Sequence, residues 1–567
     1  MKKSFSSKIC VILCFFFFPF FAFSVTRGNQ ELVPAGSWVY DNLFSISVES
    51  GIINFADNAP LSVEEIKVYL SEIDYDSLSS SGKKQYDEIQ KYFDSQLPSF
   101  DSGFLSFAIE PSLNLSGFYK TNDDLDWVYD RYERRHLLDV PLSLNCGNYL
   151  TLKMDTFLGM NKSYSLHNNV YSNIPLGADY IDINFPDEGY LSTGYVFGKN
   201  TGINFQLGKG ERNIGRTLSG SMIWSRYLTG VSYGSLTLYS PNIRYTGNVS
   251  QFGVDRYMYY HEFEGRFFKK FTFTALEGMF INAPMELRFL NPFTIFHGMA
   301  PWREYEPEEY DAESHICAYL GIKFQYVPVK NLRIYGLYAM TQFQTPFEVN
   351  NYPNDVTPNG IGGQLGSELF IPLKDGKLYF GIEGSYAQPY LYIKEGPNWT
   401  LVKTYYENSG DKRHPFYEWI GSPFGPDTVS CEFKAEYSVP HKYSLGLVYL
   451  LMARGEMSED RVFTTMAGDS RHPAWGGVHT PEKIPDDWCY PDKERQGIEN
   501  AKHNQKLVTP TGIPENVNRL SVRGTYWLND KTEITLQPSY VLIFNNDHKK
   551  GNTQQGIEIA CAVSYKF

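Results

Sequence analysis

Apolar and polar residues alternate strictly at the end of the chain. The apolar positions are Ile557, Ile559, Cys561, Val563, Tyr565 and Phe567, and the residues between them are Glu558, Ala560, Ala562, Ser564 and Lys566. Because successive side chains of a β-strand point to opposite faces, this pattern predicts a strand with one apolar and one polar face. Such a strand suits a wall between lipid and water, as in a membrane-spanning β-barrel. An ordinary sheet strand at a C-terminus would show the same alternation.

The same period of two recurs from Gly103 onward, in segments separated by turns. Two-residue turns are indicated at Gly147-Asn148, Asp375-Gly376 and Asn529-Asp530, and Asp-Gly is a preferred hairpin turn. The spacing predicts an all-β transmembrane antiparallel barrel over residues 101–567. We expect about 16–18 strands, with an even number favoured.

Long polar stretches that carry aromatic residues stand against these tight turns. They lie near residues 160–182, 299–314, 343–360, 394–430 and 455–513. Short turns at one end and long loops at the other are typical of outer-membrane barrels. A soluble β-sandwich would have shorter loops and a core between two sheets.

Residues 25–100 differ from the rest, because their apolar positions recur at helical spacing. Ser62 and Glu65 form a capping box that predicts the start of a helix. Helices are predicted over residues 38–48, 62–73 and 83–97. We expect this small N-terminal helical region to pack against the barrel wall or to plug the barrel.

The first residues have the pattern of an export signal. Lys2, Lys3 and Lys8 precede an apolar run from Val11 to Phe23. Ala22 and Ser24 flank Phe23 as a small-x-small cleavage site, so residues 1–24 are predicted to be a signal peptide cleaved near Ser24. No run of about 18 apolar residues follows, so the sequence offers no transmembrane helix.

Composition favours a barrel wall over a helical membrane protein. Aromatic residues make up 16% of the chain, yet its mean hydropathy is -0.35. This combination fits strands whose outward residues are apolar while inward residues and loops are polar. The net charge of -13 argues against nucleic acid as a partner, because phosphate binding needs a basic surface.

The sequence shows no convincing catalytic or metal-binding motif. Residues 230–234 match Gly-x-Ser-x-Gly, but a strand pattern follows Ser232 where a nucleophile elbow needs a helix. Four residues with metal-binding side chains share the longest loop, at spacings that match no ligand pattern known to us: His472, His479, Asp487 and Cys489. We therefore predict a protein that is not an enzyme and has no cofactor or metal.

Aromatic loop residues are the candidate binding groups. Trp475, Trp488 and Tyr490 lie among charged residues of the 455–513 stretch, and aromatic rings stack on sugar faces in lectins. These three residues are the candidate glycan contacts. Trp399 and Trp419 also fall in loop-like stretches. For each tryptophan, anchoring at the membrane interface is the alternative.

An acidic segment covers residues 304–313, where six acids are interleaved with aromatic residues. Such a segment could bind divalent cations or line a pore mouth. A solvated loop is the alternative interpretation.

Short motifs in the centre of the chain carry a family resemblance. They are Phe205 to Lys209, Tyr233 to Asn242, Tyr260-His261, Leu276 to Gly278, Leu290 to Phe293, and His297. This succession resembles the capsule-assembly Wzi family of outer-membrane lectin β-barrels. In that family a glycine-bearing strand leads to a Ser-Leu segment, a Tyr-His strand, a strand glutamate and an Asn-Pro turn.

The resemblance implies association of surface polysaccharide with the outer membrane, without catalysis. The family also has a small helical bundle near its barrel, as residues 38–97 do here. Its Trp-Gly-x-Gly element is not clearly present, and Ile223 to Ser225 or Tyr233-Gly234 are the candidates for its place. No binding residue carries over individually.

Three functional hypotheses remain open. The first is an outer-membrane barrel that associates surface or capsular polysaccharide with the cell surface; the alternatives are a general diffusion porin and a surface hydrolase. The expected partners are surface polysaccharide, outer-membrane lipid and the barrel-assembly machinery. Phe567 at the end of the chain resembles the C-terminal assembly signal of bacterial outer-membrane barrels, so we expect it to matter for assembly.

Overall fold

The structure is a computed structural model. It describes residues 23–95, 97–101, 103–125, 134–160, 170–177, 180–182, 186–281, 283–296, 316–351, 359–393, 401–409, 412–456 and 505–567.

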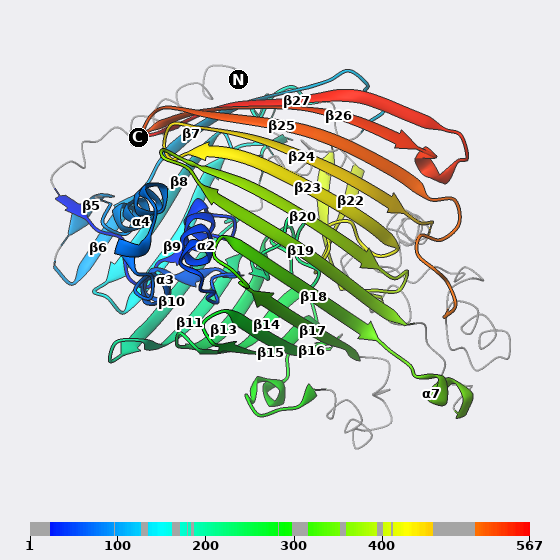
Figure 1. Cartoon of the computed structure of the whole chain (residues 1–567), viewed down its shortest axis with the longest axis horizontal. Coiled ribbons are helices and arrows are strands. Elements are labelled where there is room, and N and C mark those ends of the chain that lie inside the picture. Colours follow the sequence, from blue (N-terminus) through cyan, green and yellow to red (C-terminus); the bar gives the residue numbers. More distant parts are fainter. Residues whose placement is uncertain are drawn as a thin grey trace, which may run out of the picture.

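A closed antiparallel barrel of 18 strands forms the body of the protein (Figure 1). The strands are β7 (Ser112–Lys120), β8 (Leu138–Cys146), β9 (Leu150–Leu158), β10 (Gly189–Phe197), β11 (Thr201–Gly210), β13 (Val231–Tyr239), β14 (Ile243–Gly253), β15 (Arg256–Phe267), β16 (Phe271–Ile281), β17 (Ile316–Tyr326), β18 (Leu332–Gln342), β19 (Gly360–Pro372), β20 (Lys377–Ala387), β23 (Thr428–Val439), β24 (Tyr443–Arg454), β25 (Glu515–Asn529), β26 (Thr532–Phe544) and β27 (Thr553–Lys566). The predicted fold class is confirmed, and the strand number lies within the expected range.

The last strand closes the barrel by pairing with the first. The register of β27 against β7 runs from Glu558 opposite Lys120 to Lys566 opposite Ser112. Ile557 and Val563 are 43% and 44% exposed, whereas Glu558 between them is 1% exposed. The apolar face of the predicted strand therefore points outward and its polar face lines the interior, as a wall in lipid requires.

The two ends of the barrel differ in their connections. Gly147 and Asn148 join β8 to β9 at the end with short turns, here called the turn end. The opposite loop end carries most of the long connections and α7 (Pro346–Asn351) (Figure 1). One predicted loop is wrong: residues 394–430 include a hairpin of β21 (Val402–Ser409) and β22 (Lys412–Trp419), whose alternation is too short to stand out in sequence.

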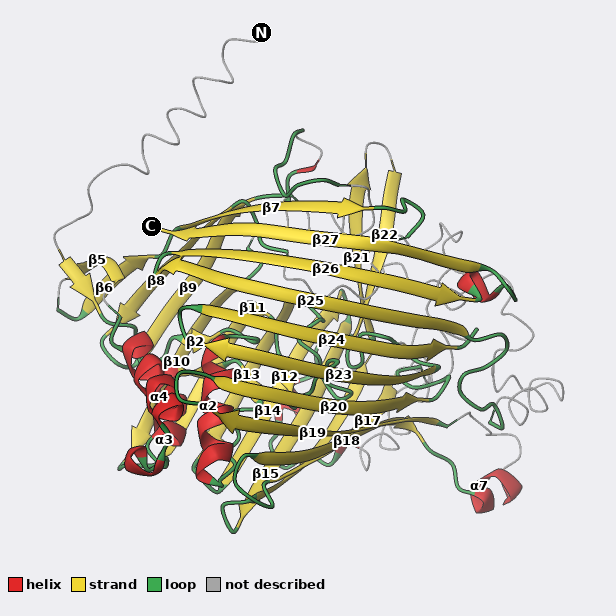
Figure 2. Ribbon diagram, turned by 45° about the horizontal axis from the view of Figure 1, so that its top comes forward, coloured by secondary structure: helices red, strands yellow, loops and turns green. Residues whose placement is uncertain are grey.

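Among the described residues, three α-helices precede the barrel: α2 (Trp38–Ser50), α3 (Val63–Leu70) and α4 (Ser80–Phe93). Figure 2 shows them together at the turn end, near the C-terminus. The predicted cap is confirmed, because the Ser62 side chain accepts a hydrogen bond from the Glu65 backbone N–H at 3.2 Å.

The third helix begins three residues earlier and ends four residues earlier than predicted. Ser79 caps it by accepting from the Gly82 N–H, and apolar spacing alone had not identified that cap. Leu97 instead opens β5 (Leu97–Asp101), which pairs with β6 (Leu105–Ile109). The second helix ends at Leu70 rather than residue 73, because its last turn is capped by Ser71.

The predicted signal peptide lies mostly outside the described residues, which begin at Phe23. β1 (Phe23–Val25) pairs with β5, with Ser24 opposite Pro98. Cleavage near Ser24 stays a prediction. Among the described residues, no helix has the length and apolar character needed to cross a membrane.

The outward face of the wall gives a first prediction. Leu536 lies in β26 and is 50% exposed. We expect Leu536→Arg to lower the free energy of unfolding by roughly 2–4 kcal/mol, because the cation would lie near the middle of the bilayer. The control is Leu528→Arg near the turn end of β25, for which we expect a loss of about 0–1 kcal/mol. Urea titration of protein folded in lipid vesicles measures both, and equal losses would contradict this placement in the membrane.

Candidate functional site

The candidate glycan contacts Trp475, Trp488 and Tyr490 lie outside the described residues. The same holds for the acidic segment 304–313 and for residues 472–489. Their predicted roles therefore stay predictions.

Phe567 is described. Its backbone N–H donates a hydrogen bond to the Pro111 carbonyl at 3.1 Å, and its ring meets Tyr565 edge-on with centroids 5.2 Å apart. The end of β27 is therefore held against the start of β7. The role of Phe567 in assembly stays a prediction.

Residues 27–95, here called the N-terminal plug, enter the barrel at its turn end (Figure 2). Their helices share one apolar core with the wall residues Tyr239 of β13 and Phe370 of β19. In the plug itself, Phe44 and Tyr69 have no exposed surface. The helical region is therefore packed into the barrel mouth. Of the two positions expected from the sequence, packing against the wall or plugging the barrel, the structure shows the plug.

Buried ion pairs join the N-terminal plug to the wall. Lys323 of β17 lies 2.6 Å from Asp57 and 3.3 Å from Glu264 of β15, with all three side chains at most 1% exposed. Arg244 of β14 lies 2.9 Å from Glu65 and 2.8 Å from Glu264. Removing charges from water costs several kcal/mol per ion, and only a well-placed partner of opposite charge offsets that cost. These pairs therefore specify how the plug sits in the lumen.

A second insertion, residues 211–230 between β11 and β13, enters from the loop end and is here called the luminal loop. Its β12 (Asn213–Ile214) pairs with β3 (Asn58–Ala59) of the N-terminal plug. The Gly215 N–H also donates to the Asp57 carbonyl at 3.0 Å. The two insertions thus meet inside the barrel through a small two-stranded sheet.

Wall carboxylates hold the luminal loop in place. Glu383 of β20 accepts a hydrogen bond from the Ser219 N–H at 2.9 Å. Arg216 lies 3.3 Å from Glu368 of β19 and also pairs with Asp41 of α2. Arg216 therefore links the luminal loop, the wall and the plug in one network.

An apolar core around Trp224 covers the luminal loop. Trp224 is 1% exposed and clusters with Tyr392 and Ile420, which belong to the connection from β20 to β23. The Tyr392 hydroxyl donates to the Met222 carbonyl at 2.6 Å. Trp419 belongs to the same core and is 3% exposed. It is therefore neither a glycan contact on a loop surface nor an anchor at the membrane interface.

The luminal loop was missed among the long loops predicted from sequence. The available signal was the break in alternation between Gly210 and Val231, together with Trp224 inside that break. Its inward course depends on Glu368 and Glu383, which lie far away in the chain. Ser232 lies in β13, which continues as a strand to Tyr239, as predicted from the pattern after it.

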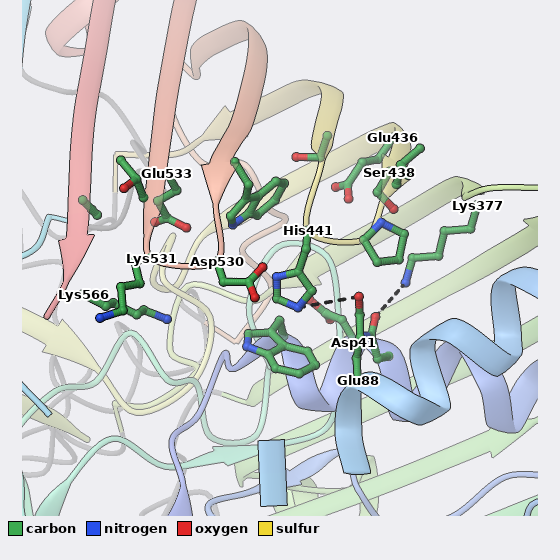
Figure 3. A pocket seen from close by; sticks show the side chains of 18 residues that line it. Asp41, Glu88, Lys377, Glu436, Ser438, His441, Asp530, Lys531, Glu533 and Lys566 are labelled. Atoms are coloured by element: carbon green, nitrogen blue, oxygen red, sulfur yellow. Dashed lines mark hydrogen bonds and ion pairs between the residues drawn. The ribbon is translucent and has the colours of Figure 1, made fainter. Parts of the chain in front are cut away.

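A cavity of about 220 Å³ separates the N-terminal plug from the turns after β23 and β25 (Figure 3). Trp38 of α2 and Trp527 of β25 line it, and Trp38 meets His441 edge-on with ring centroids 6.1 Å apart. Figure 3 shows His441 directed toward Glu88 of α4, with His441 Nε2 3.6 Å from Glu88 Oε1. On this side the plug thus faces the wall across a polar and aromatic cavity.

Both titratable groups of that contact favour their neutral forms. Burial raises the pKa of Glu88 to about 7, and burial lowers the pKa of His441. Desolvation therefore outweighs the attraction that a charged pair would have. The contact between His441 and Glu88 therefore carries little charge, unlike the buried ion pairs of Lys323 and Arg244.

Comparison with known proteins identifies the fold. No protein-family model matches the chain, and no curated protein matches it by sequence. Among solved structures it is similar to Wzi of Escherichia coli, described as a carbohydrate-binding β-barrel of the outer membrane involved in group 1 capsule assembly. That match has 11% identity and a TM-score of 0.54, and it covers 95% of this chain and 100% of Wzi.

Channel proteins match less well. The outer-membrane channel DcaP of Acinetobacter baumannii has 9% identity, a TM-score of 0.35, and coverage of 82% of this chain and 99% of its own. The anion-selective porin of Comamonas acidovorans has 8% identity, a TM-score of 0.33, and coverage of 82% of this chain and 100% of its own. The comparisons show that the chain has the fold of outer-membrane β-barrels.

The buried ion pairs predict that the N-terminal plug is released when one partner is removed. Lys323→Met leaves Asp57 buried without its cation and leaves Glu264 paired with Arg244 alone, which should cost roughly 3–5 kcal/mol. Amide hydrogen exchange of residues 27–95 in the folded barrel should become much faster. Lys84→Met is the control, because its pair with Asp375 is exposed and should contribute about 0–1 kcal/mol. Equal exchange rates in the two variants would show that Lys323 does not hold the plug.

The packing of α4 should depend on pH through Glu88. Its pKa is raised to about 7 by burial, so its contribution to stability is fully present below the pKa of an unfolded glutamate and is lost as the pH rises through about 7. Glu88→Gln should remove this dependence and slow hydrogen exchange of α4 above that pH. Asp87→Asn removes a charge from the exposed side of the same helix and should leave the dependence in place. An unchanged pH profile in Glu88→Gln would refute the assignment.

Proposed function

We propose that this protein is an outer-membrane β-barrel that holds surface or capsular polysaccharide at the cell surface, without catalysing a reaction. The observation that carries the proposal is the filled lumen between β11 and β20. There the N-terminal plug and the luminal loop meet through β3 and β12, and the charges around them are buried. A diffusion porin depends on a water-filled lumen, so this filling favours a binding protein.

The likeness to Wzi supports the same proposal, because it extends over nearly all of both chains. A shared fold does not identify the ligand. We extend carbohydrate binding to this chain because residues 455–513, the longest loop predicted from sequence, carry Trp475, Trp488 and Tyr490. Aromatic rings of this kind present flat apolar faces and polar edges to a ligand.

The proposal includes an orientation in the membrane. The plug, the short turns and the C-terminus share one end of the barrel, and the long connections share the other (Figure 1). Outer-membrane barrels have short turns on the periplasmic side and longer loops outside. The loop end would therefore face the polysaccharide, and the plug would face the periplasm.

The hydrolase alternative has little support. Ser232, the serine of the Gly-x-Ser-x-Gly match, lies in a continuous strand, and a nucleophile elbow needs a strand-to-helix turn. The porin alternative is retained as an outcome of the test below.

Two measurements on the purified protein test the proposal together. We expect retention of polysaccharide extracted from the surface of the same cells, and negligible conductance in planar bilayers. The Lys323→Met variant, in which the plug is loosened, should conduct more than the wild type. Large stable conductance of the wild type without polysaccharide binding would replace the proposal with a diffusion porin.

The aromatic loop residues give a separate prediction. Trp475→Ala combined with Trp488→Ala should abolish retention of the polysaccharide, because ring stacking is lost while no wall residue changes. Trp38→Ala at the turn end is the control and should retain binding. A heat-dependent gel shift monitors folding of both variants. Full retention by a folded double variant would remove these tryptophans from the binding site.

A further inference from the structure

A cluster of three metal-binding side chains lies at the loop end of β8 to β10. His136 precedes β8, Asp182 lies in the connection from β9 to β10, and Asp187 precedes β10. Their ligand atoms all lie within 4.8 Å of one another. His136 and Asp182 side chains are each 5% exposed, and that of Asp187 is 29% exposed. The cluster is therefore largely buried but open on one side.

The imidazole of His136 is held in a fixed orientation. It stacks on Phe157 with centroids 3.8 Å apart and planes 6° from parallel. A Cβ at Gly159 would lie 2.7 Å from His136 Cβ, so only glycine allows the backbone to approach the histidine this closely. Ring stacking on one side and the close backbone thus limit how the histidine can turn.

A carboxylate stands behind the histidine. Asp139 Oδ1 lies 3.4 Å from His136 Nδ1, and Asp139 Oδ2 accepts a hydrogen bond from the Asn114 amide at 2.7 Å. Protein metal sites commonly place a carboxylate behind the ligating imidazole, where it orients the ring and makes it more basic. An Nδ1 proton facing Asp139 would leave the Nε2 lone pair of the imidazole facing Asp182 and Asp187.

The distances across the cluster match those around a metal ion. His136 Nε2 lies 3.6 Å from Asp182 Oδ2 and 3.6 Å from Asp187 Oδ2. This exceeds the usual hydrogen-bond range of about 2.7–3.2 Å. Two ligand atoms bound at about 2.1 Å to one ion in tetrahedral geometry lie about 3.4 Å apart. The two distances from His136 are thus close to those around an ion, and the Asp182 and Asp187 carboxylates, within 4.8 Å of each other, would close around it.

Negative charge accumulates at the same place. Asp155 of β9 is close enough to the cation of Lys153 and to the carboxylates of Asp139 and Asp187 for their charges to act on it. Its backbone N–H donates to the Glu188 carbonyl at 2.9 Å, and its buried Oδ1 has no hydrogen-bond partner among the described residues. The cation on the same strand, Lys153, pairs with Glu31 at 3.1 Å. A bound cation would offset this excess of carboxylates.

We propose that His136, Asp182 and Asp187 bind one divalent transition-metal ion, with Zn²⁺ as the best fit. Imidazole suits Zn²⁺ and its neighbours in the transition series, whereas Ca²⁺ and Mg²⁺ prefer oxygen ligands. Three protein ligands leave one coordination position for water or another ligand. The ion fastens the connection between β9 and β10 to the start of β8. The site does not depend on polysaccharide binding.

Zinc titration of the folded, chelator-treated full chain in detergent tests the site, with a fluorescent zinc indicator as competitor. We expect one ion per chain whose affinity falls at least about tenfold in Asp182→Asn and about 10–100-fold in Asp139→Asn. Asp124→Asn, an exposed acid at the same end, is the control and should bind zinc as the wild type does. X-ray absorption at the zinc edge should report nitrogen and oxygen ligands without sulfur.

Three results would overturn the site. One is the absence of stoichiometric zinc binding by the folded wild type. Another is zinc binding that is unchanged in folded Asp182→Asn and Asp187→Asn, which would place the ion elsewhere, for example on the cysteine and histidines of the 455–513 stretch. The third is a preference for Ca²⁺ over Zn²⁺. The heat-dependent gel shift confirms that each variant is folded before titration.

Discussion

A wall that crosses a lipid bilayer must pair all of its backbone N–H and C=O groups, because each unpaired group in lipid costs several kcal/mol. The rest of this structure depends on that constraint. It requires β27 to meet β7, although their residues are more than 430 positions apart in the chain. Once the ring is closed, alternate side chains must face lipid and lumen. The apolar outer face and the polar inner face both follow from closure.

A polar interior then needs partners of its own. The inward faces of β14 to β20 carry buried charged side chains: Arg244, Glu264, Lys323, Arg333, Glu368 and Glu383. The N-terminal plug supplies Asp57 and Glu65, and the luminal loop supplies Arg216. Because each insertion neutralises charges on the wall, the wall and its filling stabilise each other. The result is a barrel held together from inside, with its long connections at one end.

Much of this design is visible in the chain. The period of two in residues 557–567 predicts both the closing strand and which of its faces meets lipid, since that pattern is local. The Ser62 cap likewise predicts the start of α3. Errors fall where a local signal is weak: α4 begins at Ser80 because of a serine cap that apolar spacing does not reveal. The β21–β22 hairpin was missed because its alternation is short. The luminal loop was missed because its course depends on contacts with distant elements.

The sequence by itself therefore determined the barrel fold, the closing strand with its outward face and the start of α3, because each rests on neighbours within a few positions. Only the tertiary structure decided that the lumen is filled between β11 and β20, that Asp57 meets Lys323, and that His136 meets Asp182 and Asp187. Those residues are 46 or more positions apart and have no characteristic spacing. Packing of the plug inside the barrel brings Asp57 to Lys323, and pairing of β8, β9 and β10 brings His136 near Asp182 and Asp187. Contacts between residues so far apart in the chain leave no local pattern in it.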